Sequence, residues 1–260
     1  MSLQEFIENL SREDLELIKK EFDKKENKIP TYSFSKIKFK DLESLFDIEK
    51  NIIDESRFDD WFNAKYKISK KKTNKFQKLI DRNRALIHQY NEEDLKVKFI
   101  IPLLNKVGFL SYENEFRDFY ELPITYKTDD FIFQGTTDFV VSKGLLKSKK
   151  PYFFIQEFKR DKEFSDPEPQ LLAELIAGVE LNGEKMMRGA YIVGSYWNFV
   201  ILEKLGERKY QYFISENFDS TKIGDLKNIY KNLVFVREEI LERVKRETRQ
   251  KNPLTILNKV

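Results

Sequence analysis

Apolar residues recur at helical spacing towards both ends of the chain and alternate with a period of two through its middle, from Tyr112 onward. Ser11 to Asp14 resembles a helix capping box, and Gly108 follows an apolar helical stretch as a stop signal. The spacing predicts helices over residues 2–27, 41–51, 76–90, 91–107 and 222–246, and from Ser165 or Asp166 to residue 182. Residues 28–40 are expected to form a loop or short strands.

The alternating segments predict strands over residues 121–126, 131–133 continuing through 137–141, 152–159, 190–194, 198–203 and 210–214. Gly135 lies inside the second of these strands and is expected to mark a bend or bulge. A helix, three strands, a helix and a further strand imply a mixed sheet with helices on its faces. We therefore expect an α/β domain over residues 76–260, preceded by a helical extension over residues 1–75.

The composition excludes several kinds of functional site. The chain has 260 residues, 40% of them hydrophobic, and its formal net charge is only +3, so overall charge does not point to a polyanionic partner. Cysteine is absent and His88 is the sole histidine, which excludes disulfides, cysteine–zinc sites and sites that need two histidines. A metal ion would be held by oxygen ligands, which favours Mg²⁺ or Mn²⁺. Because there is no signal-peptide pattern and no long apolar run, a soluble, cytoplasmic protein is expected.

Local clusters of basic residues could still contact nucleic acid. Seven lysines occur between Lys65 and Lys78, where they form either a solvated face or linker, or contacts to phosphates. Further basic stretches cover residues 143–150 and 237–251. The candidate nucleic-acid-binding residues are Lys70, Lys71, Lys72, Lys149, Lys150 and Arg160.

The region around residues 135–175 carries charged side chains that suit phosphodiester hydrolysis. Glu157 and Lys159 are two apart on a predicted strand, so they project from the same face, and Asp138 lies on the strand before it. Glu92 lies on the buried stripe of the preceding helix, where a carboxylate is unusual without a partner. Carboxylates can hold a divalent cation beside a phosphate, and a lysine can stabilise the developing negative charge.

These residues also have ordinary structural explanations. A Glu–Lys pair on a solvated sheet face is common, and Glu92 and Glu93 could be present only because acidic residues favour a helix N-terminus. The apolar run over residues 153–155 argues against the first explanation, because it indicates a central strand in which charged groups are costly.

The spacing of the charged residues resembles a known family. Asp138, eighteen further residues and then Glu157-Phe158-Lys159 are similar to the D…(D/E)xK signature of the PD-(D/E)XK nucleases. The stretch NEEDLKVKFIIPLL resembles the first helix of the type I restriction enzyme nuclease domain, and Gln170 in QLLAELIAG resembles the downstream glutamine of RecB-related nucleases. The similarity extends from Asn91 to about Ile214 and also includes an uncharacterised bacterial group of this superfamily.

The resemblance implies a restriction-endonuclease-like fold and an endonuclease that uses Mg²⁺ or Mn²⁺ to cut nucleic acid, with DNA the expected substrate. Its role would be in restriction, defence or repair, and a homodimer would be compatible with cutting both strands. The implied roles are metal ligation by Asp138 and Glu157, an outer ligand at Glu92, the catalytic lysine at Lys159, and orientation of that lysine or of a metal-bound water by Gln170.

Two positions depart from the family pattern, and two other functions stay open. Thr137 stands where the family often has proline, and Glu174 stands four residues after the glutamine, where tyrosine is often found. One alternative is a catalytically silent protein of this fold that binds DNA or another partner. The other is a metal-independent ribonuclease, because Arg82 and His88 fit the R-N-x4-H pattern of HEPN ribonucleases.

Overall fold

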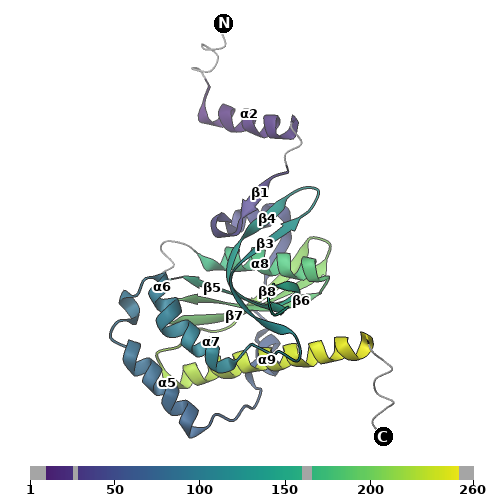
Figure 1. Ribbon diagram of the computed structural model, residues 1–260. Helices are drawn as coiled ribbons and strands as arrows, with labels where there is room; N and C mark the ends of the chain where they lie inside the picture. Colours follow the sequence, from purple (N-terminus) through teal and green to yellow (C-terminus); the bar gives the residue numbers. More distant parts are fainter. Residues whose placement is uncertain (1–9, 26–28, 160–165, 252–260) are drawn as a thin grey trace.

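The computed structural model describes residues 10–25, 29–159 and 166–251, and within them nine strands form one mixed sheet with helices on both faces (Figure 1). The strands are β1 Thr31–Ser33, β2 Asp47–Lys50, β3 Phe116–Lys127, β4 Ile132–Lys143, β5 Lys149–Lys159, β6 Met186–Val193, β7 Tyr196–Gly206, β8 Lys209–Ile214 and β9 Phe218–Asp219. The α/β class with a mixed, helix-flanked sheet is therefore confirmed.

The helices alternate with the strands along the chain. The α-helices are α2 Arg12–Lys25, α3 Phe39–Leu45, α4 Asp59–Phe62, α5 Lys70–Asn83, α6 Glu92–Leu95, α7 Ile101–Val107, α8 Pro167–Asn182 and α9 Ile223–Lys251. Short 3₁₀ segments are η1 Phe34–Lys36, η2 Glu55–Phe58 and η3 Ile87–Gln89, and a π-helical segment, η4 Lys96–Ile100, joins α6 to α7. No helix in the described part of the chain is long and apolar enough to cross a membrane.

The order of strands across the sheet is β1-β4-β5-β6-β7-β8-β2, with β3 paired to β4 and β9 to β7. β5 and β6 are parallel and are joined through α8, whereas β3, β4 and β5 form an antiparallel meander. β8 and β2 are also parallel. β1 and β2 come from residues 31–50, so the stretch before residue 76 contributes strands to the sheet as well as helices.

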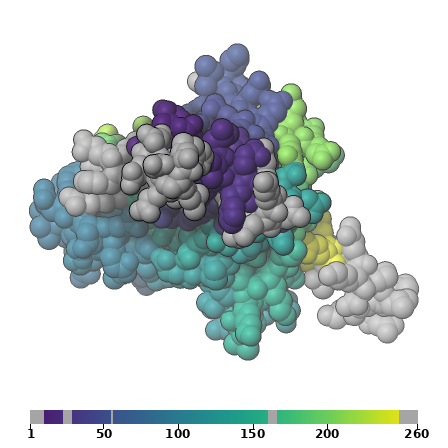
Figure 2. Space-filling view, turned by 90° about the horizontal axis from the view of Figure 1, so that it is seen from above, coloured from purple at the N-terminus to yellow at the C-terminus, as the bar shows by residue number. Residues whose placement is uncertain are grey.

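Two apolar clusters lie on opposite faces of the sheet. One buries the inner sides of α5, α7 and α9 against Phe139, Phe154 and Phe199, and the other buries α8 with η1 and α3 against Ile155 and Tyr210. Figure 1 shows α8 on one side of the strands and the long α9 on the other. In Figure 2, α2 lies in front of the rest of the molecule, and the blue segment that contains α5 to α7 forms one flank.

Local sequence signals account for several helix ends. Asn91 caps α6, since its Oδ1 accepts a hydrogen bond from the Asp94 amide at 2.7 Å, and Asp166 caps α8 in the same way from Glu168. Gly108 ends α7 with a left-handed φ of 77°. The capping box at Ser11 is present, because Ser11 and Asp14 exchange side-chain to main-chain hydrogen bonds.

Two sequence predictions in the first half of the chain are wrong in part. The helix expected over residues 41–51 ends at Leu45, because Phe46 and Ile48 are buried and Asp47 between them is exposed, so residues 47–50 become strand β2 beside β8. The helix expected over residues 76–90 begins earlier, at Lys70, and ends at Asn83.

The bend expected at Gly135 is also wrong, because β4 pairs with β3 without interruption through this residue. A Cβ atom at this position would lie 2.9 Å from the ring of Phe34. The glycine is needed for close packing of η1 against the strand, not for a change of chain direction.

Candidate active site

Two carboxylates from neighbouring strands meet at the centre of the predicted site. β4 and β5 run antiparallel, and their register brings Asp138 next to the end of β5. Asp138 Oδ2 accepts a hydrogen bond from the Phe158 amide at 2.8 Å, and Glu157 Oε1 accepts a longer one from the Asp138 amide at 3.3 Å. Each carboxylate is thus oriented by the backbone of the opposite strand.

Glu157 is the more deeply buried carboxylate of this pair, and it is almost completely shielded from solvent. Its Oε2 atom has no hydrogen-bond partner and lies 3.6 Å from the Lys159 Nζ atom. Burial raises the pKa of Glu157 well above its usual range, and the nearby charges of Glu174 and Asp138 raise it further. The Glu157 carboxyl group also shares a side-chain hydrogen bond with that of Glu174, so this buried pair needs a proton or a cation.

Lys159 carries a positive charge within the acidic group. Burial by itself would lower the pKa of Lys159, but the charges of Glu157, Glu92 and Asp138 outweigh this effect and raise the pKa above its usual value. The side chain is only 16% exposed. Lys159 is consequently an ammonium group at neutral pH, suited to hold negative charge.

Glu92 reaches the same site from the first turn of α6. Burial is the main cause that raises the pKa of Glu92. The positive charge of Lys159 lowers this pKa, and the negative charge of Asp138 raises it. Glu92 is half-buried, whereas Glu93 is exposed, in agreement with the helical spacing. The four residues Glu92, Asp138, Glu157 and Lys159 therefore come together from one helix and two strands.

Gln170 and Glu174 lie on α8, and Glu174 is next to Glu157 of β5. Gln170 Nε2 donates to Glu174 Oε1 at 3.1 Å, and both side chains are buried. Burial raises the pKa of Glu174 to about 8. The predicted site contained Gln170 but not Glu174, although a single acid inside the apolar run over residues 171–179 is a signal that could have identified it.

Lys96 and Glu121 also belong to the site and were absent from the prediction. Lys96 Nζ donates to Glu121 Oε1 at 2.7 Å and to Asp138 Oδ1 at 3.1 Å. Lys96 is four residues after Glu92, on the same side of the helix as Ile100, and this spacing could have indicated an inward-pointing lysine. Glu121 carries no comparable sequence signal.

The donor set fits a hard divalent cation. Five carboxyl groups, from Glu92, Glu121, Asp138, Glu157 and Glu174, surround two lysines, so the group has more potential negative than positive charge. All of the donors are oxygens, which Mg²⁺ and Mn²⁺ prefer. Within the described residues, no three acidic or histidine side chains lie close enough together to hold a metal ion in the positions they occupy here. The fit rests on the chemistry of the donors and on the buried Glu157 Oε2 atom, which has no hydrogen-bond partner.

The candidate nucleic-acid-binding lysines lie away from these residues. Lys149 and Lys150 begin β5, so at ~3.3 Å per residue they are about 33 and about 30 Å from Lys159 at its other end. Lys70 and Lys71 are exposed in the first turn of α5, and Lys72 contacts the Tyr230 hydroxyl on α9. The list is completed by Arg160, which lies outside the described residues.

Arg82 and His88 do not join the acidic site. Arg82 is exposed near the end of α5, and His88 is exposed in η3. Both side chains face solvent, and they lie on the consecutive elements α5 and η3. A catalytic role for the two together would need further groups, such as those of a second protein molecule or of a substrate.

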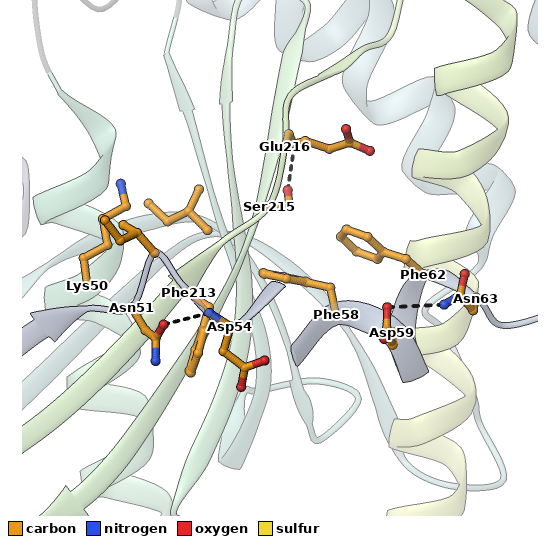
Figure 3. A pocket seen from close by; sticks show the side chains of 12 residues that line it. Lys50, Asn51, Asp54, Phe58, Asp59, Phe62, Asn63, Phe213, Ser215 and Glu216 are labelled. Carbon is orange, nitrogen blue, oxygen red and sulfur yellow. Dashed lines mark hydrogen bonds between the residues drawn. The ribbon is translucent and has the colours of Figure 1, made fainter. Parts of the chain in front are cut away.

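A separate cavity of about 530 Å³ lies where β2 and β8 end (Figure 3). Its walls combine aromatic rings, among them the stacked pair Phe58 and Phe62, with polar groups of Asn51 and Ser215. None of the acidic site residues lines it. The cavity and the acidic site are therefore distinct features of the molecule.

Comparison with known proteins gives no family assignment: no protein-family model matches the chain, and no curated protein is similar to it.

Proposed function

We propose that the protein is a metal-dependent nuclease that hydrolyses phosphodiester bonds, with DNA as the expected substrate. The observation that carries the proposal is the convergence of Asp138, Glu157 and Lys159 at one sheet position, with the buried Glu157 Oε2 atom lacking a hydrogen-bond partner. Burying more carboxyl groups than ammonium groups is costly unless a proton or a cation is bound among them.

The arrangement of the elements supports a restriction-endonuclease-like fold. Helices α6 and α7 precede the antiparallel strands β3, β4 and β5, and α8 then leads into the parallel strand β6. This is the order of helix, three strands, helix and strand that the resemblance to PD-(D/E)XK nucleases implies.

In this proposal Asp138 and Glu157 hold Mg²⁺ or Mn²⁺, and Glu92 serves as an outer ligand. A bound cation of this kind supplies charge neutralisation at the scissile phosphate and lowers the pKa of a coordinated water. Lys159 is protonated at neutral pH, so it stabilises negative charge on the phosphate and does not act as a base. The backbone amides of Asp138 and Phe158 keep the two carboxylates oriented.

The test is a cleavage assay on supercoiled plasmid, linear duplex, single-stranded DNA and RNA, each with Mg²⁺, with Mn²⁺ and with EDTA. Wild-type cleavage is expected only with metal, and Asp138→Asn and Lys159→Met are each expected to reduce the rate roughly 10³-fold or more. Lys98→Met is the matched control, because Lys98 is an exposed lysine paired with Asp94.

Other outcomes would replace the proposal. RNA cleavage that persists in EDTA and in Asp138→Asn would favour a reaction by Arg82 and His88. Tight DNA binding without cleavage by the wild type, under all metal conditions, would favour a silent protein of this fold.

A further inference from the structure

A buried lysine lies between two carboxylates at the edge of the acidic site. The Lys96 side chain is only 9% exposed, and its ammonium group donates to both Asp138 Oδ1 and Glu121 Oε1. The same atom is 5.8 Å from the centre of the Phe158 ring. Lysines are rarely buried to this extent unless they are paired, so this position is built around the charge.

Glu121 reaches Lys96 through an unusual backbone conformation. In the β3–β4 register, Glu121 lies between the pairs Tyr120–Phe139 and Leu122–Thr137, directly opposite Asp138. Its φ is +49°, in the left-handed region that residues with a side chain seldom adopt in a strand. Such conformations cost free energy and tend to be kept where they serve a site.

The helix that carries Lys96 is also irregular at this residue. The π-helical segment Lys96–Ile100 interrupts the helix between Glu92 and Val107. Pro102 explains the irregularity in part, because it has no amide hydrogen to donate to the carbonyl four residues earlier. Single π turns of this kind are frequent at functional sites.

We infer that Lys96, held by Glu121, is a positioning residue that orients Asp138 for the divalent cation. Asp138 is anchored at both oxygens, with Phe158 on Oδ2 and Lys96 on Oδ1. Removing either anchor frees the carboxylate to rotate. This role rests on the proposed metal-dependent function.

Glu121 explains how a lysine can support a metal ligand. A single ammonium beside Asp138 would repel an incoming cation. The hydrogen-bonded Glu121 carboxylate compensates the charge of Lys96, and the pair is close to neutral. The pair can therefore fix the direction of the Asp138 oxygens without opposing the cation, in the manner of the outer groups that support metal ligands.

The experiment measures Mn²⁺ binding by isothermal titration calorimetry on the full chain, without nucleic acid. Lys96→Met is expected to weaken Mn²⁺ binding roughly 10- to 100-fold, as removal of a supporting group typically does. Lys96→Arg retains the positive charge and has donors for both carboxylates, so it is expected to restore most of the affinity. Lys98→Met, which alters an exposed lysine on the same segment, is expected to bind as the wild type does.

Glu121→Gln separates this role from a general loss of structure, since the Glu121 side chain is 61% exposed. It is expected to weaken Mn²⁺ binding roughly threefold to tenfold, and the double variant with Lys96→Met is expected to be no weaker than Lys96→Met alone, because the two residues act as one unit. If Lys96→Met does not fold, the Glu121→Gln result decides.

Two results overturn the inference in distinguishable ways. If the wild type binds Mn²⁺ and both Lys96→Met and Glu121→Gln bind it equally tightly or more tightly, the positioning role is wrong while the metal site stands. If the wild type itself binds no Mn²⁺, the metal site and the proposed function fail together with this role.

Discussion

Gln170 Nε2 donates to Glu174 Oε1 at 3.1 Å across one turn of α8. The resemblance to known nucleases implied that Gln170 orients the catalytic lysine or a metal-bound water. Its amide nitrogen donates to the buried Glu174 carboxyl group, while its Oε1 atom has no hydrogen-bond partner, so the orienting role stays a prediction. Glu174 thus connects α8 to Glu157 on β5, and both carboxyl groups are buried.

The first prediction concerns stability and pH. The folded-state pKa of Glu174 is raised to about 8 from 4.5 by burial, and that of Glu157 is raised for the same reason. Between these values the folded protein retains protons that the unfolded chain releases, so the free energy of unfolding falls as pH rises from about 4.5 to 8. The shift of Glu174 corresponds to a loss on the order of 5 kcal/mol without metal.

Glu174→Gln checks this prediction, because it keeps the shape and removes the titrating group. The variant is expected to match the wild type near pH 4.5 and to exceed it in stability near pH 8, as measured by urea unfolding in EDTA. Parallel stability curves for the two proteins across this range would show that Glu174 is not perturbed.

The second prediction concerns metal binding and pH. Protons held by Glu157 and Glu174 compete with a cation, because the ligands must be ionised to bind it. Mn²⁺ is therefore expected to raise the unfolding temperature more at pH 8 than at pH 6. Asp138→Asn is expected to abolish the effect at both pH values, and an equal shift in this variant would place the metal elsewhere.

The third prediction compares two adjacent glutamates at the start of α6. Glu92 is half-buried beside Lys159 and Asp138, whereas Glu93 is exposed. Glu92→Gln is expected to reduce metal-dependent cleavage roughly tenfold or more, and Glu93→Gln to leave it within a factor of about two. Because both lie in the first helical turn, their effects on helix stability are similar. Equal cleavage rates for the two variants would mean that Glu92 has only a capping role.

The fourth prediction concerns the packing that holds the site. A Cβ atom on Gly189 would lie 2.9 Å from the carbonyl oxygen of Ile155 on β5 and 3.0 Å from the Leu175 side chain on α8. Gly189→Ala is expected to lower the free energy of unfolding by roughly 1–3 kcal/mol, because neither neighbour can move freely. Gly224→Ala, on α9, meets no atom within 4 Å and is expected to be neutral or slightly stabilising. Chemical denaturation of both variants gives the comparison.

The fifth prediction concerns the basic residues at the other end of β5. Lys149 and Lys150 are about 33 and about 30 Å from Lys159 along β5, which corresponds to roughly nine or ten base pairs of duplex DNA. Replacing both by alanine is expected to leave binding of a duplex of ~8 base pairs unchanged and to weaken binding of one of ~24 base pairs only if the duplex runs along the strand. The affinities of the wild type and the variant for both duplexes are measured by titration at two salt concentrations. Weaker binding of the short duplex by the variant would contradict the distance argument.

The sequence by itself determined the class of the fold and most of its elements. The period of two in the segments on either side of α8 predicted the strands, since successive side chains of a strand point to opposite faces of the sheet. Asn91, Gly108 and Asp166 predicted helix ends correctly, because capping depends on hydrogen bonds within a few residues. The spacing of Glu157 and Lys159 likewise predicted a shared face, which their contact confirms.

Only the tertiary structure decided which other groups surround those residues. Glu121 depends on the β3–β4 register and on a left-handed backbone angle, and Glu174 depends on how α8 packs against β5. Neither relationship is local, so no periodicity reports it. The strand at residues 47–50 has the same origin: a short stretch became β2 because β8 offered an open edge, and hydrogen bonding to that edge outweighed the helical preference of the sequence before it.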